Sequence, residues 1–159
     1  MAERKEPPPD VLDPDRRYSA RVLTERGAFV IALDRQAAPV TVNNFVTLAR
    51  EGYYVGLTFH RVVPGFVAQG GDPTGTGSGG PAYKLPDETN PCEWGRGSVG
   101  MASSTAGVSG SQFFVVKADA PHLARSGVYN HFGSVSEGME VVETIREGDR
   151  MSSIEIEEA

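Results

Sequence analysis

The sequence FHRVVPGFVAQGGD, residues 59–72, contains two short runs of β-favouring residues separated by Pro64-Gly65. Glycine breaks the pattern between them, so residues 58–63 and 66–69 predict two short strands. Two further glycines end the second run. This stretch therefore indicates β-structure with short strands.

Alternation along the first predicted strand puts Phe59, Arg61 and Val63 on one face. An arginine between two apolar neighbours needs a reason. The ordinary explanations are a side chain that snorkels to solvent or pairs with a carboxylate. Gln69 would ordinarily be a surface amide or a turn residue, and residues 110–114, Gly-Ser-Gln-Phe-Phe, would ordinarily be core strand. Neither cluster decides the function alone.

The rest of the chain extends the β pattern. Residues 18–33 predict a hairpin, and further strands are predicted at residues 97–102, 113–116, 128–132 and 151–157. Two helices are predicted, one from Pro39 to the cap Gly52 and one over residues 136–146 with Ser136 as N-cap, and none between residues 53 and 132. The count predicts a mainly β fold, a closed eight-stranded antiparallel barrel capped by two helices, since closure removes exposed strand edges.

Length and composition exclude several classes of protein. The chain has 159 residues, which fits one domain, and its 19 glycines and 11 prolines argue against a helical bundle. Residues 1–16, with Pro7-Pro8-Pro9 and many charges, predict a flexible, solvated arm before a domain at residues 17–159. The net charge of −6 argues against nucleic-acid or membrane partners. The single Cys92 and the lack of an apolar leader predict a soluble cytoplasmic protein.

Several common catalytic arrangements are absent from the sequence. Residues 75–80 fit G-x-G-x-x-G, but neither a strand before them nor a helix after them is predicted, so they indicate a surface loop and not a dinucleotide site. The three histidines lack metal-ligand spacing, and no nucleophile elbow presents a serine. Cys92 has no basic neighbour closer than Arg96 and is expected to be inert.

Taken together, the two clusters resemble the cyclophilin family of peptidyl-prolyl cis-trans isomerases. The resemblance covers about residues 18–157 and is carried by several segments: Asn44-Phe45, Gly52-Tyr53-Tyr54, residues 59–72, Gly100-Met101-Ala102, residues 111–114 and Phe132-Gly133. The family fold is an eight-stranded antiparallel barrel with two capping helices. It agrees with the count of elements reached from the residues alone.

The resemblance implies a catalytic role for Arg61, Gln69 and Phe66. Arg61 matches the family's arginine, which donates towards the prolyl nitrogen and stabilises the twisted amide, and a lysine would lack its planar fork. Substrate-binding roles are implied for Val67, Gly75, Ala102, Ser103, Gln112, Phe114, His122, Leu123 and Tyr129. Phe66, Val67, Phe114 and Leu123 match the proline pocket, while Ala102 and Ser103 match the edge that binds the peptide backbone. No cofactor or metal is implied, and weak pH dependence is expected.

Three departures from the family pattern affect which residue roles can be expected of this chain. Ser103 stands where many members have asparagine, and His122 where well-known eukaryotic members have tryptophan, so we expect weak binding of cyclosporin. The segment of residues 124–127 is slightly longer than is usual in the family. Tyr129 falls where other members often have a histidine, as a tyrosine does in many bacterial-type members. The expected partners are proline-containing peptides and unfolded or flexible protein segments, and the expected state is a monomer.

Two other functions remain open from the sequence. The groove could be a peptide-binding or chaperone-like module in which turnover is incidental. Alternatively, the arm with Pro7-Pro8-Pro9 could be the functional element of an interaction protein, although three prolines among charges are more often a linker. The combination of Arg61, Phe66, Gln69 and Phe114 favours the enzyme, which would assist folding by isomerising exposed X-Pro bonds.

Overall fold

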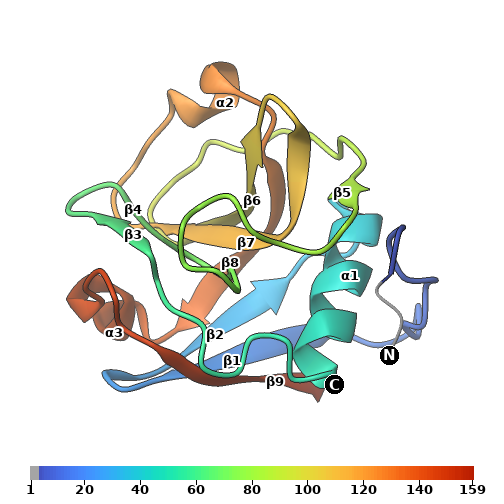
Figure 1. The fold of residues 1–159 in the computed structure, drawn as a ribbon, viewed down its shortest axis with the longest axis horizontal. Helices are drawn as coiled ribbons and strands as arrows, with labels where there is room; N and C mark the ends of the chain where they lie inside the picture. Colours follow the sequence, from blue (N-terminus) through green and yellow to red (C-terminus); the bar gives the residue numbers. More distant parts are fainter. Residues whose placement is uncertain (1–3) are drawn as a thin grey trace.

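The computed structural model describes residues 4–159, and one antiparallel sheet dominates it (Figure 1). Eight strands follow in the order β3-β4-β7-β6-β8-β2-β1-β9, and β5 pairs with β7 beside this path. The bounds are β1 Tyr18–Thr24, β2 Gly27–Leu33, β3 Arg61–Val63, β4 Val67–Gly70, β5 Lys84–Leu85, β6 Ser98–Ser104, β7 Gly107–Val116, β8 Asn130–Glu137 and β9 Met151–Glu158. The mainly β, antiparallel class predicted from the sequence is confirmed.

The prediction of a closed barrel is wrong, because the sheet is curled but open. Its end strands, β3 and β9, are not paired with each other. Residues 56–59, before β3, and residues 148–151, at the start of β9, meet instead. They are joined by the bridge between Thr58 and Arg150 and by four backbone hydrogen bonds, two of them made by Phe59. The strand predicted at residues 58–63 is β3, and it begins only at Arg61. With three residues, β3 is too short to close the sheet.

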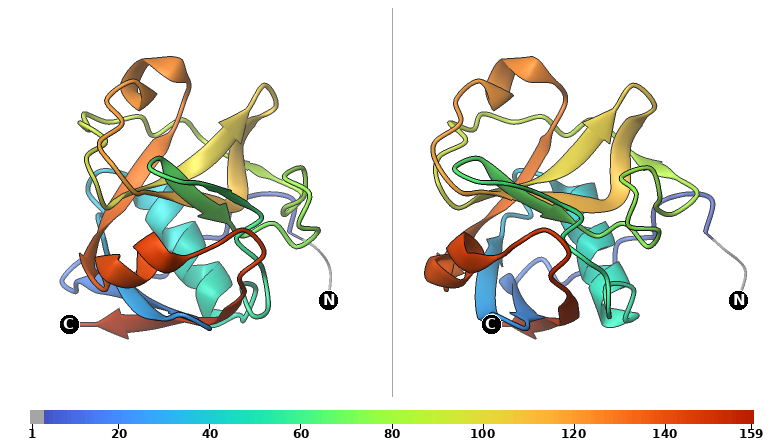
Figure 2. Two further views of the ribbon diagram at one scale, coloured as in Figure 1. Left: turned by 90° about the vertical axis from the view of Figure 1, so that its left-hand side faces the viewer. Right: turned by 60° about the vertical axis from the view of Figure 1, so that its left-hand side comes forward.

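Three helices accompany the sheet: α1 Pro39–Arg50, α2 Leu123–Ser126 and α3 Met139–Thr144. Figures 1 and 2 show α1 and α3 at opposite ends of the curled sheet, with α2 above the start of β8. The prediction of two helices missed α2, which is a single turn. The predicted start of the last helix is also wrong: β8 continues to Glu137, and Gly138, in the left-handed region at φ 82°, precedes α3.

The first helix forms where the sequence predicted it. Pro39 occupies its first turn, and Gly52, just after the end of the helix, has the positive φ of 76° that glycine adopts easily. Phe45 projects from α1 into the core, where its ring lies 5.1–5.4 Å from the rings of Tyr54, Phe113 and Phe132. This aromatic cluster joins the helix to β7 and β8.

Asn44 fixes α1 to β7 by polar contacts in the same core. The side chain is fully buried, its Nδ2 donates to the Gly110 carbonyl at 2.8 Å, and its Oδ1 accepts from the Tyr83 hydroxyl. Tyr54 donates to the Ser111 carbonyl at 2.9 Å. Burial raises the pKa of Tyr54 and raises that of Tyr83 to about 12, so both remain donors at neutral pH. These bonds hold the part of β7 that leads to Gln112 and Phe114.

The N-terminal segment packs against α1, where its composition predicted a solvated arm. Pro8 and Leu12 are buried, and the Asn43 side chain on α1 bonds to the carbonyls of Pro8 and Pro9 and to the N–H of Val11. The segment therefore contributes apolar surface and hydrogen bonds to the fold. This packing was not predicted, because one leucine and a proline ring among charged residues are too weak a signal in the sequence.

Candidate active site

A cavity of about 390 Å³ lies where β3, β4, β6, β7 and α2 meet. It is lined by Arg61, Phe66, Val67, Gln69, Ala102, Ser103, Phe114, His122, Leu123, Ser126 and Tyr129. Ten of these eleven were candidates from the sequence, and Ser126 was not. Gln112 lines the adjoining cavity instead, and Gly75 lines neither.

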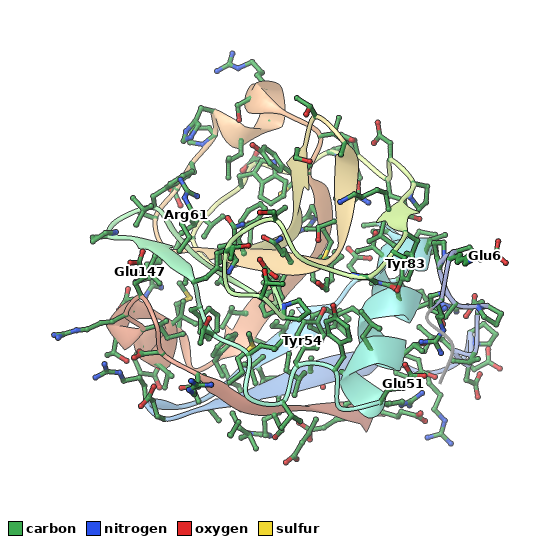
Figure 3. The ribbon with its side chains drawn as sticks, in the orientation of Figure 1. Glu6, Glu51, Tyr54, Arg61, Tyr83 and Glu147 are labelled. Carbon is green, nitrogen blue, oxygen red and sulfur yellow. The ribbon has the colours of Figure 1, made fainter. Side chains whose placement is uncertain are left out.

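Arg61 stands at the rim of this cavity. It is exposed and directly opposite Gln69 in the β3–β4 register, so the two side chains share a face. Figure 3 shows it extending from the β3–β4 hairpin, far from Tyr83 and Glu51 on the α1 side. Seven other arginines in residues 4–159 have a carboxylate within ion-pair distance, whereas Arg61 has none. Its guanidinium is therefore available to a ligand.

The expectation that Phe59 shares the face of Arg61 is wrong. Phe59 is fully buried in the main core, with Val62 packed against the same cluster. Val63 packs against a second, smaller cluster beneath the cavity. Alternation fails between residues 59 and 61 because β3 begins only at Arg61.

The apolar wall of the cavity belongs to the second cluster. Val67, Phe114 and Leu123 are 2–5% exposed, which leaves only a small edge of each at the surface. Trp94 lies behind Phe114, with the two rings stacked at 5.5 Å, and a second ring contact joins Phe114 to Tyr129. Two further aromatic rings therefore support the apolar wall. The position of Trp94 at the site was not predicted from the sequence, because the long loop between β5 and β6 brings it there.

The backbone of β6 changes its pairing where it passes the cavity. Met101 pairs with Phe113 of β7 and with Asn130 of β8, but the register shifts before Ser103 pairs with Val108. Ala102, between them, has no partner in the register of either neighbour. A break of this kind leaves main-chain groups available for an extended ligand.

A chain of hydrogen bonds orients the polar side of the cavity. The Gln69 Nε2 donates to Gln112 Oε1 at 3.2 Å, and the Gln112 Nε2 donates to the carbonyls of Gly77 and Gly79 at 3.0 and 2.9 Å. With the Gln69 nitrogen bound to Gln112, its carbonyl oxygen is free to accept from Arg61 or from a ligand N–H. The glycine-rich loop thus helps to orient Gln69.

Asp72 organises that loop. Asp72 is 1% exposed, and its carboxylate accepts backbone N–H bonds from Thr74, Thr76, Gly77 and Gly79 at 2.6–3.1 Å. Burial raises the pKa of Asp72, but these bonds and one from the Thr74 hydroxyl outweigh it and lower the pKa to about 2. The predicted surface loop is therefore exposed, and it is folded around one carboxylate.

The low pKa of Asp72 predicts an acid-labile loop. The unfolded chain binds this proton more tightly, so stability is full above about pH 5 and is lost as the pH falls towards 2. A pKa lowered from 3.8 to about 2 corresponds to about 2 kcal/mol of unfolding free energy. We expect Asp72→Asn to lose about that much at pH 7 and much less near pH 2.5, measured by urea unfolding at each pH. An equal loss at both pH values would contradict the assignment.

The three histidines occupy different environments. His122 lines the cavity, with its ring 5.3 Å from that of Phe66. Burial lowers the pKa of His60 and of His131, which favours their neutral forms at pH 7. Within the part of the chain that the structure describes, no three His, Cys, Asp or Glu side chains are grouped to hold a metal ion.

Comparison with known proteins identifies the family and the fold. The model of the cyclophilin-type peptidyl-prolyl cis-trans isomerase family matches residues 19–159, which is most of the chain. The chain belongs to the cyclophilin family. It is a cyclophilin-type isomerase, an enzyme that acts on X-Pro peptide bonds.

Relatives of this cyclophilin come from several organisms. A peptidyl-prolyl cis-trans isomerase of Synechococcus elongatus is 46% identical over 135 residues, covering 84% of this chain and 92% of that protein. Peptidyl-prolyl cis-trans isomerase B of Bacillus subtilis is 49% identical over 124 residues, covering 77% and 85%. A cyclophilin-type isomerase of Cryptosporidium parvum, crystallised in the presence of the dipeptide Ala-Pro, is 32% identical with a TM-score of 0.78, covering 87% and 98%.

Within residues 4–159, no helix has the length and apolar character needed to cross a bilayer.

Proposed function

We propose that this cyclophilin binds the proline ring of a peptide in the 390 Å³ cavity and that Arg61 accelerates rotation about the preceding peptide bond. The observation that carries the proposal is an exposed arginine, without a carboxylate partner among residues 4–159, at the rim of a cavity that has one apolar wall and one polar side. Burying the ring against Phe66, Val67, Phe114 and Leu123 would remove apolar surface from water. The Ala-Pro dipeptide used with the Cryptosporidium parvum relative supports a proline ligand.

The proposed mechanism stabilises the twisted amide. Rotation about an X-Pro bond is slow because resonance gives the C–N bond partial double-bond character. When the bond twists, the prolyl nitrogen becomes pyramidal and gains a lone pair that accepts a hydrogen bond. A guanidinium that donates to this nitrogen stabilises the transition state more than the planar ground state, which is the requirement for catalysis. Arg61 supplies the donor, and the Gln69 oxygen holds the donor in place or accepts from the substrate.

The peptide backbone would lie along β6. Ala102 lacks a register partner there, so its N–H and carbonyl can pair with an extended substrate. Ser103 offers a hydroxyl beside it, and Tyr129 and His122 close the other side of the cavity. The substrates we propose are exposed X-Pro bonds in unfolded or flexible chains, so the enzyme would assist folding. No proton transfer is required, so activity should depend weakly on pH.

Refolding provides the test of the folding role. A protein whose refolding is limited by X-Pro isomerisation should refold faster when catalytic amounts of this cyclophilin are added, and the Arg61→Ala variant should lack the effect. If the wild type slows or merely holds the unfolded chain, the groove is a peptide-binding module.

His122 predicts weak recognition of cyclosporin, with dissociation constants above those of members that carry tryptophan there. An imidazole presents less apolar surface than an indole and cannot reproduce its contacts, even though His122 is placed by its ring contact with Phe66. We expect His122→Trp to tighten cyclosporin binding by about five- to thirty-fold, which corresponds to about 1–2 kcal/mol. Calorimetric titration of both proteins measures this, with His131→Phe as a control outside the cavity. Unchanged affinity would show that His122 does not form the subsite.

A further inference from the structure

A cavity of about 850 Å³, here called the α3 cavity, lies between the β3–β4 hairpin and α3. Val62, which alternates with Arg61 along β3, lines it together with the turn at residues 64–65 and with residues 143–147. Figure 3 shows Glu147, from this lining, on the same side of the molecule as Arg61. No residue lines both this cavity and the proline cavity. The α3 cavity is therefore a separate space that touches the hairpin carrying Arg61.

Lys117 connects the α3 cavity to that hairpin. It follows β7 directly, and its backbone N–H donates to the Phe66 carbonyl at 2.7 Å. Its side chain lines the cavity, where the Nζ donates to the Ile145 carbonyl at 3.2 Å. Ile145 is the residue that ends α3. A chemical change at the Lys117 amine would therefore take place between α3 and the hairpin.

The surroundings of the Lys117 amine increase the fraction of its neutral form. The residue is half-buried, and among residues 4–159 its Nζ has one hydrogen-bond acceptor and no carboxylate within ion-pair distance. An ammonium ion has three N–H groups to satisfy, so burial with one acceptor disfavours the charge. Burial accordingly lowers the pKa of Lys117, and the opposite effect of Glu143 is smaller. A neutral amine that donates one N–H to Ile145 keeps its lone pair free for nucleophilic attack.

Two guanidinium groups line the same cavity. Arg146 is exposed and has no carboxylate within ion-pair distance among the described residues. Arg26 binds Asp149 through its Nε and one Nη at 2.9 and 3.2 Å, which leaves its other Nη for a ligand. Guanidinium groups match the geometry of a phosphate, and Val62 and Ile145 add apolar surface beside them. The cavity thus suits a small ligand with a phosphate and an apolar part.

The acidic groups that face the α3 cavity are Glu143 and Glu147. Glu143 is already bound by Arg96, whose Nε and one Nη donate to it at 3.1 and 2.5 Å. Glu147 is exposed, so water and salt screen its charge. One unpaired carboxylate therefore faces the two guanidinium groups and the Lys117 amine.

We propose that Lys117 is a modification site, at which its amine takes the acyl group from a small acyl phosphate bound in the α3 cavity. An acyl phosphate combines the phosphate that the arginines recognise with a carbonyl carbon that an amine attacks. The Lys117 nitrogen forms the amide C–N bond, and the C–O bond to the phosphate breaks. Inorganic phosphate leaves with the electron pair of that bond, and the proton lost from the nitrogen passes to it or to water. The neutral amide then replaces a positive charge between α3 and the hairpin.

The small number of lysines makes this proposal directly testable. The chain contains only Lys5, Lys84 and Lys117, and the first two are exposed and serve as internal controls. The folded protein is incubated with acetyl phosphate at neutral pH, and peptide mass spectrometry follows the acetylated fraction of each lysine over time. We expect Lys117 to react at least about three-fold faster than either exposed lysine, because a bound donor is held beside its amine. Added inorganic phosphate should compete for the cavity and reduce this lead.

Two variants and a second reagent test the phosphate contact. Arg146→Gln should remove most of the lead of Lys117. Arg125→Gln should leave it intact and is the matched control, since Arg125 on α2 is also exposed and without a carboxylate partner among the described residues. Circular dichroism verifies the fold of both variants. Acetic anhydride, which has no phosphate, should give Lys117 a smaller lead.

Three results would each overturn the proposal. The first is a Lys117 that reacts with acetyl phosphate no faster than Lys5 and Lys84. The second is a lead that is as large with acetic anhydride as with acetyl phosphate. The third is a lead that Arg146→Gln leaves unchanged.

Discussion

Replacing Arg61 with alanine should lower kcat/KM for a short X-Pro peptide by about 100- to 1000-fold, the usual cost of removing one preorganised donor to a transition state. Arg61 is exposed and has no carboxylate partner among the described residues, so its removal leaves no buried charge unpaired and should leave the fold intact. Circular dichroism and the urea midpoint check this.

Arg61→Lys is the sharper variant. It keeps the positive charge but loses the planar fork that Gln69 can orient, so we expect most of the activity to be lost as well. Near-normal activity in Arg61→Lys would mean that a point charge suffices and that the directed hydrogen bond is not the main contribution.

Phe45→Ala should lower the free energy of unfolding by about 3–5 kcal/mol, which is the range for truncating a buried aromatic side chain. Phe45 is fully buried and contacts the rings of Tyr54, Phe113 and Phe132 at 5.1–5.4 Å, so the cavity left behind cannot collapse easily. Single domains are stable by about 5–15 kcal/mol, so the loss is a large share of the total. Urea unfolding measures it.

Two further variants keep this prediction informative. Phe45→Leu, which retains most of the volume, covers the case in which Phe45→Ala does not fold, and it should lose less stability. Phe66→Ala serves as the control from the cavity: Phe66 is only partly buried, so stability should change little while peptide turnover falls. A change of less than about 1 kcal/mol in Phe45→Ala would contradict the role of the aromatic cluster.

Local signals in the sequence predicted local structure well. Pro39 and Gly52 bracket α1 because proline fits the first turn and glycine fits the left-handed position after the last. The N-cap of α3 was predicted at Ser136, two residues before the observed Gly138, because serine is a good N-cap type. In the structure Ser136 lies within β8 and its hydroxyl bonds to the Val30 carbonyl. Pairing of β8 with β2 overrides the local preference there.

The same difference between local and long-range signals applies to the site. Arg61, Phe66 and Gln69 come from one hairpin, so their proximity follows from a short turn. Trp94, which stacks on Phe114, was not recognised, because the loop that carries it has no periodic signal. Whether the sheet closes could not be predicted from the sequence either, since it depends on whether the strands at the two ends of the sheet, β3 and β9, meet. Such contacts are set by the whole fold and not by any one segment.

We expect Arg61 to act on the twisted amide, and therefore on the rate of rotation, and not on the binding of the peptide. Exchange NMR on a short X-Pro peptide at saturating concentrations of wild type and of Arg61→Ala separates these, because it reports both occupancy and the rate of cis/trans exchange in the bound state. We predict that Arg61→Ala binds the peptide within a few-fold of wild type while bound-state exchange falls by at least 100-fold. Bound-state exchange as fast as in wild type, with only the affinity reduced, would contradict the account.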